Sequence, residues 1–140
     1  MNFWDTSALF RCYATREPGH DWAMNLLASR DRRAGSVLLL PELAGALTRQ
    51  AGPDRAIADH MVRKMREDLS GFELVPADIA QAELAARMAS VWRLRGADAL
   101  HLASAFMVAR EFRRGFRFVT SDVDQAAAAR AEKLKVILVA

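Results

Sequence analysis

Four acidic residues stand where apolar segments of this 140-residue chain begin or end, and carboxylates in such positions can do chemistry. They are Asp5, Glu42, Asp98 and Asp122. The residues around Asp5, Asp98 and Asp122 are apolar or small, which places these carboxylates near the core. An unpaired carboxylate near a core is costly, and the flanking residues offer no basic partner for all four. The sequence therefore predicts that a bound cation neutralises them.

The ligand types indicate which cation this is. An all-oxygen set of carboxylates favours a hard ion such as Mg²⁺ or Mn²⁺. Zinc is disfavoured, because the histidines are scattered without an H-x-x-x-H or H-E-x-x-H pair and the only cysteine is Cys12. Carboxylate-held Mg²⁺ is used in proteins to hydrolyse phosphate esters. The predicted reaction is the attack of a metal-activated water on a phosphodiester, without a protein nucleophile.

Each acid, taken alone, also has a purely structural interpretation. Aspartate is a preferred N-cap residue, and acids in the first turn of a helix complement the helix dipole. Under this interpretation the chain is a catalytically silent module that binds nucleic acid or protein. The occurrence of all four acids together argues against it, because a decayed site would be expected to lose some of them.

The charge balance supports a polyanionic substrate. The chain has 20 Lys and Arg against 17 Asp and Glu, a net charge of +3. Without the four acids, 20 basic residues face 13 acidic ones, which leaves +7 on the rest of the molecule. A basic body around an acidic metal site fits a nucleic-acid substrate. The candidates for contacts to its backbone are Arg93, Arg95, Arg113 and Arg114, whose alternative role is that of a solvated helix surface.

Short apolar runs alternate along the chain with longer segments of helical periodicity. The predicted strands are residues 2–4, 37–40, 73–75, 116–120 and 136–139. The predicted helices are residues 7–15, 21–33, 42–50, 55–69, 79–93, 98–114 and 125–133. This order predicts a layered α/β domain with a mainly parallel sheet. Three of the acids then follow strand ends, where ligand sites of open α/β sheets form, and Asp98 opens the most apolar helix.

Composition sets the class of protein. A hydrophobic content of 52 % with 26 % charged residues is that of one globular domain, residues 1–140, and excludes a disulfide miniprotein or a disordered tail. The lone cysteine, the absence of a signal-peptide pattern and the lack of a long apolar run predict a cytoplasmic protein without a membrane segment.

Four segments resemble, in order and spacing, the motifs of a known family. They are DTSAL at 5–9, ELAGAL at 42–47 with Arg49, GADALHLA at 96–103 and FVTSD at 118–122. The family is that of the PIN-domain ribonucleases, and the similarity is greatest to the VapC toxins of toxin-antitoxin modules. The resemblance extends over essentially the whole chain. It implies a three-layer α/β/α fold with a central sheet of about five strands.

The resemblance also implies a function. The chain would be a Mg²⁺- or Mn²⁺-dependent endoribonuclease that cleaves cellular RNA, is silenced by a VapB-type antitoxin and forms a homodimer. The metal-binding acids would be Asp5, Glu42, Asp98 and Asp122. Ser7 and Thr120 would be their polar neighbours, and Asp124 stands at a position that is variable in the family. Two departures, Asn2 in a very short first strand and Pro41 before Glu42, affect the local geometry and remove no acid.

The sequence leaves a different enzyme class as an alternative. A haloacid-dehalogenase-like phosphatase or a receiver domain would use Asp5 as a phosphorylated nucleophile. The former needs a second Asp where this chain has Ser7, and both need a Lys late in the sheet, for which Lys133 and Lys135 are poorly placed. His101, three residues after Asp98, is expected to form a hydrogen bond near the site. A structural role is the simpler interpretation of this histidine than a catalytic one.

Overall fold

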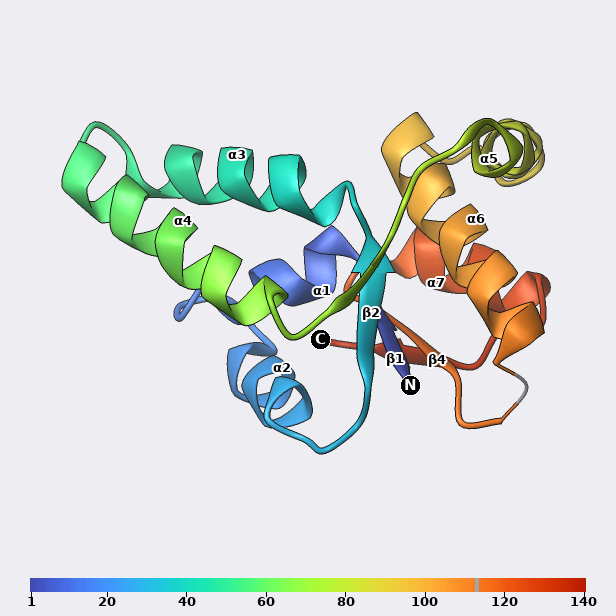
Figure 1. Ribbon diagram of the computed structural model, residues 1–140, viewed down its shortest axis with the longest axis horizontal. Coiled ribbons are helices and arrows are strands. Elements are labelled where there is room, and N and C mark those ends of the chain that lie inside the picture. Colours follow the sequence, from blue (N-terminus) through green and yellow to red (C-terminus); the bar gives the residue numbers. More distant parts are fainter. Residues whose placement is uncertain (113) are drawn as a thin grey trace.

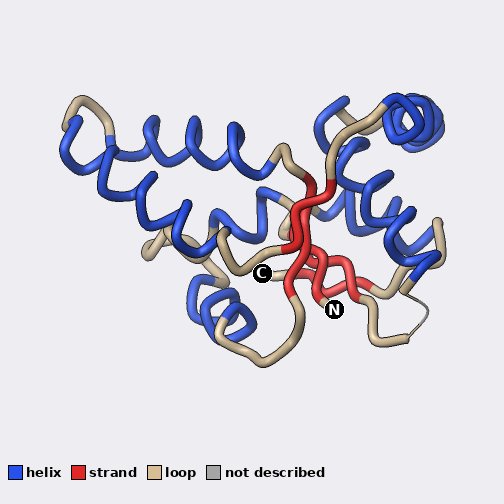
Figure 2. The backbone as a smooth tube through the Cα atoms, in the orientation of Figure 1, coloured by secondary structure: helices blue, strands red, loops and turns tan. Residues whose placement is uncertain are grey.

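The computed structural model describes residues 1–112 and 114–140 and has a five-stranded sheet with the order β3-β2-β1-β4-β5. The strands are β1 Asn2–Trp4, β2 Arg33–Ser36, β3 Glu73–Val75, β4 Arg117–Thr120 and β5 Val136–Leu138. Every pair of neighbouring strands is parallel. Figure 2 shows the strands at the centre with helices on both sides. The predicted α/β class and strand number are confirmed.

Helices cover both faces of the sheet (Figure 1). One face carries α1 Thr6–Phe10, α2 His20–Leu27, α3 Leu39–Ala51 and α4 Arg55–Leu69, and the other carries α5 Ile79–Trp92, α6 Gly96–Glu111 and α7 Val123–Ala131. Alternate residues of one strand therefore enter different cores: Trp4 packs with α1 to α4, and Phe3 packs with α5 to α7. Both side chains are fully buried. The result is the three-layer α/β/α arrangement.

The predicted strand at 37–40 is wrong. The strand β2 lies four residues earlier, at Arg33–Ser36, and Leu39 already begins α3. Leu39, Leu43 and Leu47 are all fully buried, so the apolar run belongs to one face of a helix. The small residues of β2 suit its position, because a side chain at Gly35 would collide with Leu39 and approach the carbonyl oxygen of Trp4 to 3.1 Å. Correspondingly, α2 ends at Leu27 rather than at residue 33.

Several other boundaries agree with the sequence-based expectation, but α1 ends at Phe10 rather than at residue 15, and α3 begins at Leu39 rather than at residue 42. β1, β3 and α4 have the predicted limits, and α6 is buried along residues 101–105 as expected for a central apolar helix. The predicted end of α6 at residue 114 is too late, because the helix ends at Glu111. No helix in the described ranges is long and apolar enough to span a membrane.

Candidate active site

Asp5 lies at the carboxyl end of β1, where the chain turns directly into α1. Its side chain caps that helix, accepting a hydrogen bond from the Ala8 amide at 3.0 Å, and also accepts from Ser7 Oγ at 2.9 Å and Thr120 Oγ1 at 3.0 Å. The side chain is only 2 % exposed. Burial raises the pKa of Asp5 to about 6, although the charge of His101 and these hydrogen bonds act in the opposite direction. This carboxyl group therefore holds its proton far more readily than an exposed aspartate does.

Ser7 and Thr120 join the ends of two neighbouring strands around Asp5. The Ser7 hydroxyl accepts from the Ser121 amide at 2.9 Å and lies 3.2 Å from Thr120 Oγ1. Thr120 in turn accepts from the Asp122 amide at 3.1 Å. Both residues predicted as polar neighbours thus contact the Asp5 carboxylate and orient it.

Asp122 follows β4 and is the N-cap of α7. One of its oxygens, Oδ1, accepts hydrogen bonds from the amides of Asp124 at 2.8 Å and Gln125 at 2.9 Å. Among the described residues, the second oxygen makes no hydrogen bond. The capping interpretation is therefore correct for Asp5 and Asp122, yet capping occupies only part of the Asp122 carboxylate.

Glu42 reaches the site from a helix and not from a strand end. It lies in the first turn of α3, and its carboxylate accepts a hydrogen bond from the Thr6 hydroxyl and lies 2.7 Å from His101 Nε2. Burial alone would raise the pKa of Glu42, but the hydrogen bonds from His101 and Thr6, together with the charge of His101, lower it below its usual value. Glu42 is held as an anion.

Asp98 is the acid whose charge is least compensated. It lies in the first turn of α6 and is partly buried, and its carboxylate makes no hydrogen bond or ion pair with any residue in 1–112 or 114–140. Its pKa is raised by burial, then by the charges of Asp122 and Glu42, while His101 and Arg95 lower it. Acids from α3, α6 and the end of β4 therefore repel one another across one small region.

The carboxylates fit a hard divalent cation by their chemistry. They offer only oxygen ligands, and a cation would relieve the repulsion at Asp98. Their present geometry is not closed around an ion: within the described ranges, no three His, Cys, Asp or Glu side chains are placed to hold one together. The hydrogen bonds to Asp5 and Glu42 account for this, because they direct both carboxylates toward protein donors.

A hollow of about 480 Å³ opens beside the acids. Glu42, Asp98 and the hydroxyls of Thr6 and Ser7 line one part of it, and the rest is lined by Phe10, Pro41, Gly45, Ala46 and Arg49. Glu42 and Asp98 are thus reachable from solvent by a ligand of nucleotide size, whereas Asp5 lies buried behind them.

The buried Gln125 and the partly buried Thr6 are two polar residues of the site that the sequence did not indicate. Gln125 is fully buried, lies with Oε1 2.7 Å from Thr120 Oγ1 and donates to the Asp98 carbonyl at 3.0 Å, which ties β4, α7 and α6 together. Its only signal is an amide in an alanine-rich helix. Thr6 directly follows Asp5, and nothing in its own sequence context marks it as a site residue. His101 was expected near the site and does lie there, 3.1 Å from the Thr6 hydroxyl.

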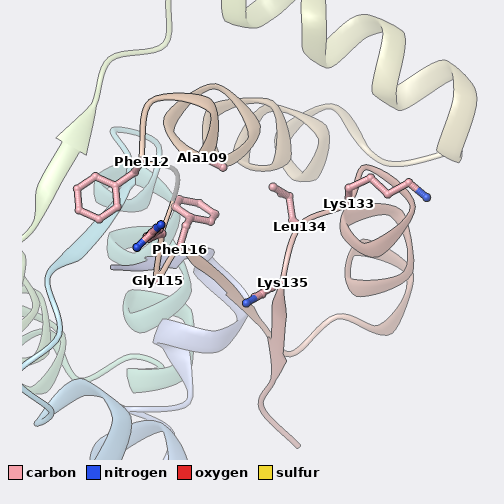
Figure 3. Close-up of a pocket in the computed structure, with 8 residues that line it drawn as sticks. Ala109, Phe112, Gly115, Phe116, Lys133, Leu134 and Lys135 are labelled. Carbon is pink, nitrogen blue, oxygen red and sulfur yellow. The ribbon is translucent and has the colours of Figure 1, made fainter.

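The predicted arginines are divided between the two ends of the sheet. Arg93 and Arg95 lie between α5 and α6, and Arg95 is close enough to lower the pKa of Asp98. Arg114 lies at the opposite end of β4 from Asp122, at a hollow of about 380 Å³ with Phe116 and Lys135. Figure 3 shows that hollow, with Lys133 extending away from the other labelled side chains. Arg113 lies outside the described residues.

Asp124 contacts the other acids through its backbone amide, which donates to Asp122 Oδ1 at 2.8 Å. Its side chain is exposed and lines a hollow with Trp92 and Arg93.

A parallel α/β sheet with acids near the carboxyl ends of its strands has them where ligand sites of open α/β folds form. The model of the PIN domain family matches residues 3–133, and the chain belongs to this family. No curated protein matches the sequence.

Solved structures share the fold at low identity. FitAcB from Neisseria gonorrhoeae is 17 % identical with a TM-score of 0.71, covering 98 % of this chain and 96 % of that one. VapC20 from Mycobacterium tuberculosis, a sarcin-ricin loop cleaving toxin, is 22 % identical with a TM-score of 0.68, covering 91 % and 95 %. A toxin-antitoxin complex from Klebsiella pneumoniae is 18 % identical with a TM-score of 0.68, covering 100 % and 98 %.

Proposed function

We propose that this chain is a Mg²⁺- or Mn²⁺-dependent endoribonuclease that acts as the toxin of a toxin-antitoxin pair. The observation that carries the proposal is Asp98: a partly buried carboxylate on a PIN fold, without a partner among the described residues and with its pKa raised by Asp122 and Glu42. Such a group is stabilised by a cation, and PIN-domain relatives include an RNA-cleaving toxin.

The four acids Asp5, Glu42, Asp98 and Asp122 would hold the ion. When bound, it supplies positive charge for the phosphodiester and lowers the pKa of an attacking water. Ser7 and Thr120 orient Asp5, while His101 and Thr6 orient Glu42. Arg95 places a guanidinium near Asp98, where it would interact with the negative charge of a substrate phosphate.

The geometry argues against Asp5 as a phosphorylated nucleophile. The side chain is 2 % exposed and both of its oxygens accept hydrogen bonds, Oδ1 from the Ala8 amide that it caps, so neither oxygen is free to attack a phosphorus atom.

Two partners belong to the proposal. Structural relatives include toxin-antitoxin complexes, which supports a VapB-type antitoxin that silences the nuclease. The active form is proposed to be a homodimer in the cytoplasm, with cellular RNA as the substrate.

The test is cleavage of a labelled single-stranded RNA by the purified protein. Cleavage should require Mg²⁺ or Mn²⁺, stop on addition of EDTA and be lost in Asp5→Asn. Asp21→Asn is the matched control, since Asp21 is exposed on α2. Cleavage that persists in EDTA, or full activity of Asp5→Asn, would contradict the metal mechanism.

A further inference from the structure

A second hollow adjoins the acidic site, between the end of α5 and the first half of α7. It measures about 340 Å³ and is lined by Trp92, Arg93, Asp124, Ala127 and Ala128. The amide of Asp124 donates to the Asp122 carboxylate at 2.8 Å, so this hollow lies next to one of the four acids. It combines an aromatic ring, a cation and a hydrogen-bond acceptor in one place.

Trp92 is held in position and is still 36 % exposed. Its indole N–H donates to the Glu132 carboxylate at 2.9 Å, and the same oxygen accepts from Arg87 at 3.2 Å. The polar edge of the ring is therefore fixed from the end of α7. A large aromatic surface that is oriented in this way can stack on a planar ligand with little further loss of freedom.

Arg93 occupies a backbone position that favours glycine. It terminates α5 in the left-handed conformation, with φ of 55°. Its guanidinium makes no hydrogen bond or ion pair with the residues described by the structure, and Arg95 follows two residues later. An arginine at a strained position that uses none of its donors within the described chain is suited to an external anion.

We propose that this hollow binds an unpaired nucleotide of the RNA that is cleaved at the neighbouring acids. The base stacks on Trp92, Arg93 contacts a phosphate, and Asp124 accepts a hydrogen bond from a base N–H. This assignment rests on the proposed nuclease function and deepens it. Because a base inside a duplex has no free face, the subsite selects RNA that is single-stranded next to the cleaved bond.

The experiment measures RNA binding in EDTA, where no metal-dependent cleavage occurs. The probe is a fluorescent single-stranded RNA octamer, read by anisotropy, with the full chain carrying Trp92→Leu or Trp92→Phe. Both substitutions remove the indole N–H that meets Glu132, and only leucine removes the aromatic face. Trp92→Leu should weaken binding about tenfold, and Trp92→Phe should bind nearly as well as the wild type. Trp22→Leu is the control, because Trp22 is 48 % exposed on α2, across the sheet.

Arg93→Gly adds a second readout. Glycine accepts the left-handed conformation, so the variant should fold at least as well as the wild type and yet bind the octamer several-fold less tightly. Unchanged affinity of Trp92→Leu, or equal losses in the leucine and phenylalanine variants, would overturn the stacking assignment. If such variants still cleave RNA with Mg²⁺ and an unchanged KM, the nuclease function stands and the subsite is wrong. A wild-type protein that binds the octamer through Trp92 and never cleaves it would instead refute the nuclease.

Discussion

The imidazole Nε2 of His101 lies 2.7 Å from the carboxylate of Glu42, a contact between residues 59 apart in the sequence. The Thr6 hydroxyl joins both groups, at 3.1 Å from the same nitrogen. His101 is 1 % exposed, so α6 holds an acid of α3 from the buried side of the site. The carboxylate that seemed to depend on a strand end is positioned by a histidine.

His101→Ala should destabilise the protein by about 2–4 kcal/mol, because it leaves a cavity and removes a buried hydrogen-bond partner of Glu42. Urea unfolding at neutral pH measures this. The pKa of Glu42 is lowered on folding, so its stabilising contribution is present above the unfolded value of 4.5 and is lost as pH falls through the folded value. That acid-side loss should be smaller in His101→Ala. His60→Ala, at an exposed position of α4, should change stability little, and a similar small effect at His101 would contradict the contact.

Asp5 should make the metal-free protein less stable as pH rises. Its pKa is raised from 3.8 to about 6 on folding, so the unfolded chain releases this proton first. The contribution of Asp5 to the free energy of unfolding is therefore fully present below pH 3.8. It is lost as pH rises to 6, and the total loss is about 3 kcal/mol.

Unfolding in EDTA across this pH range tests the expectation against Asp5→Asn. The free energy of unfolding of Asp5→Asn should rise relative to that of the wild type from pH 4 to 7. The exposed control Asp21→Asn should follow the wild-type curve. A constant difference between Asp5→Asn and the wild type would show that Asp5 is not the titrating group.

Asp98→Asn should leave the metal-free protein as stable as the wild type or more stable, since it removes the repulsion by Asp122 and Glu42. Mn²⁺ or Mg²⁺ should raise the Tm of the wild type by roughly 5–10 °C at about 100 times its Kd, and should raise that of Asp98→Asn much less. Thermal unfolding with and without the ion measures both effects. A marked fall in the Tm of metal-free Asp98→Asn would favour a structural role for this acid.

Gly35→Ala should destabilise the fold by about 1–3 kcal/mol. The added methyl group would collide with the buried Leu39 side chain and approach the Trp4 carbonyl oxygen to 3.1 Å, forcing β1, β2 and α3 apart. Gly45→Ala is the contrasting variant: inside α3 its nearest neighbour is the flexible end of Arg49, at 3.1 Å. This change should stabilise by about 0.5–1 kcal/mol through helix propensity. Equal effects in chemical denaturation would refute the difference.

Much of the fold could be predicted because the glycine and proline residues between segments agree with the periodicity of the segments themselves. The α4 limits follow from the Gly52-Pro53 and Ser70-Gly71 breaks on either side of the helical pattern, and the buried α6 follows from its small apolar residues. The strand β2 could not be predicted, because the apolar run at 37–40 fits a buried strand and the start of a helix equally well. Packing against β1 decided between them, since small residues were needed beside Trp4.

The sequence by itself predicted which acids form the site, because carboxylates after parallel strands and at helix starts are expected to converge at one edge of the sheet. Only the tertiary structure decided how each is held. Thr120 reaches Asp5 across 115 residues, and Gln125 links β4 to the carbonyl of Asp98. Such contacts depend on how helices pack over the sheet, and this packing is set by the two apolar cores and leaves no local pattern around the polar residues themselves.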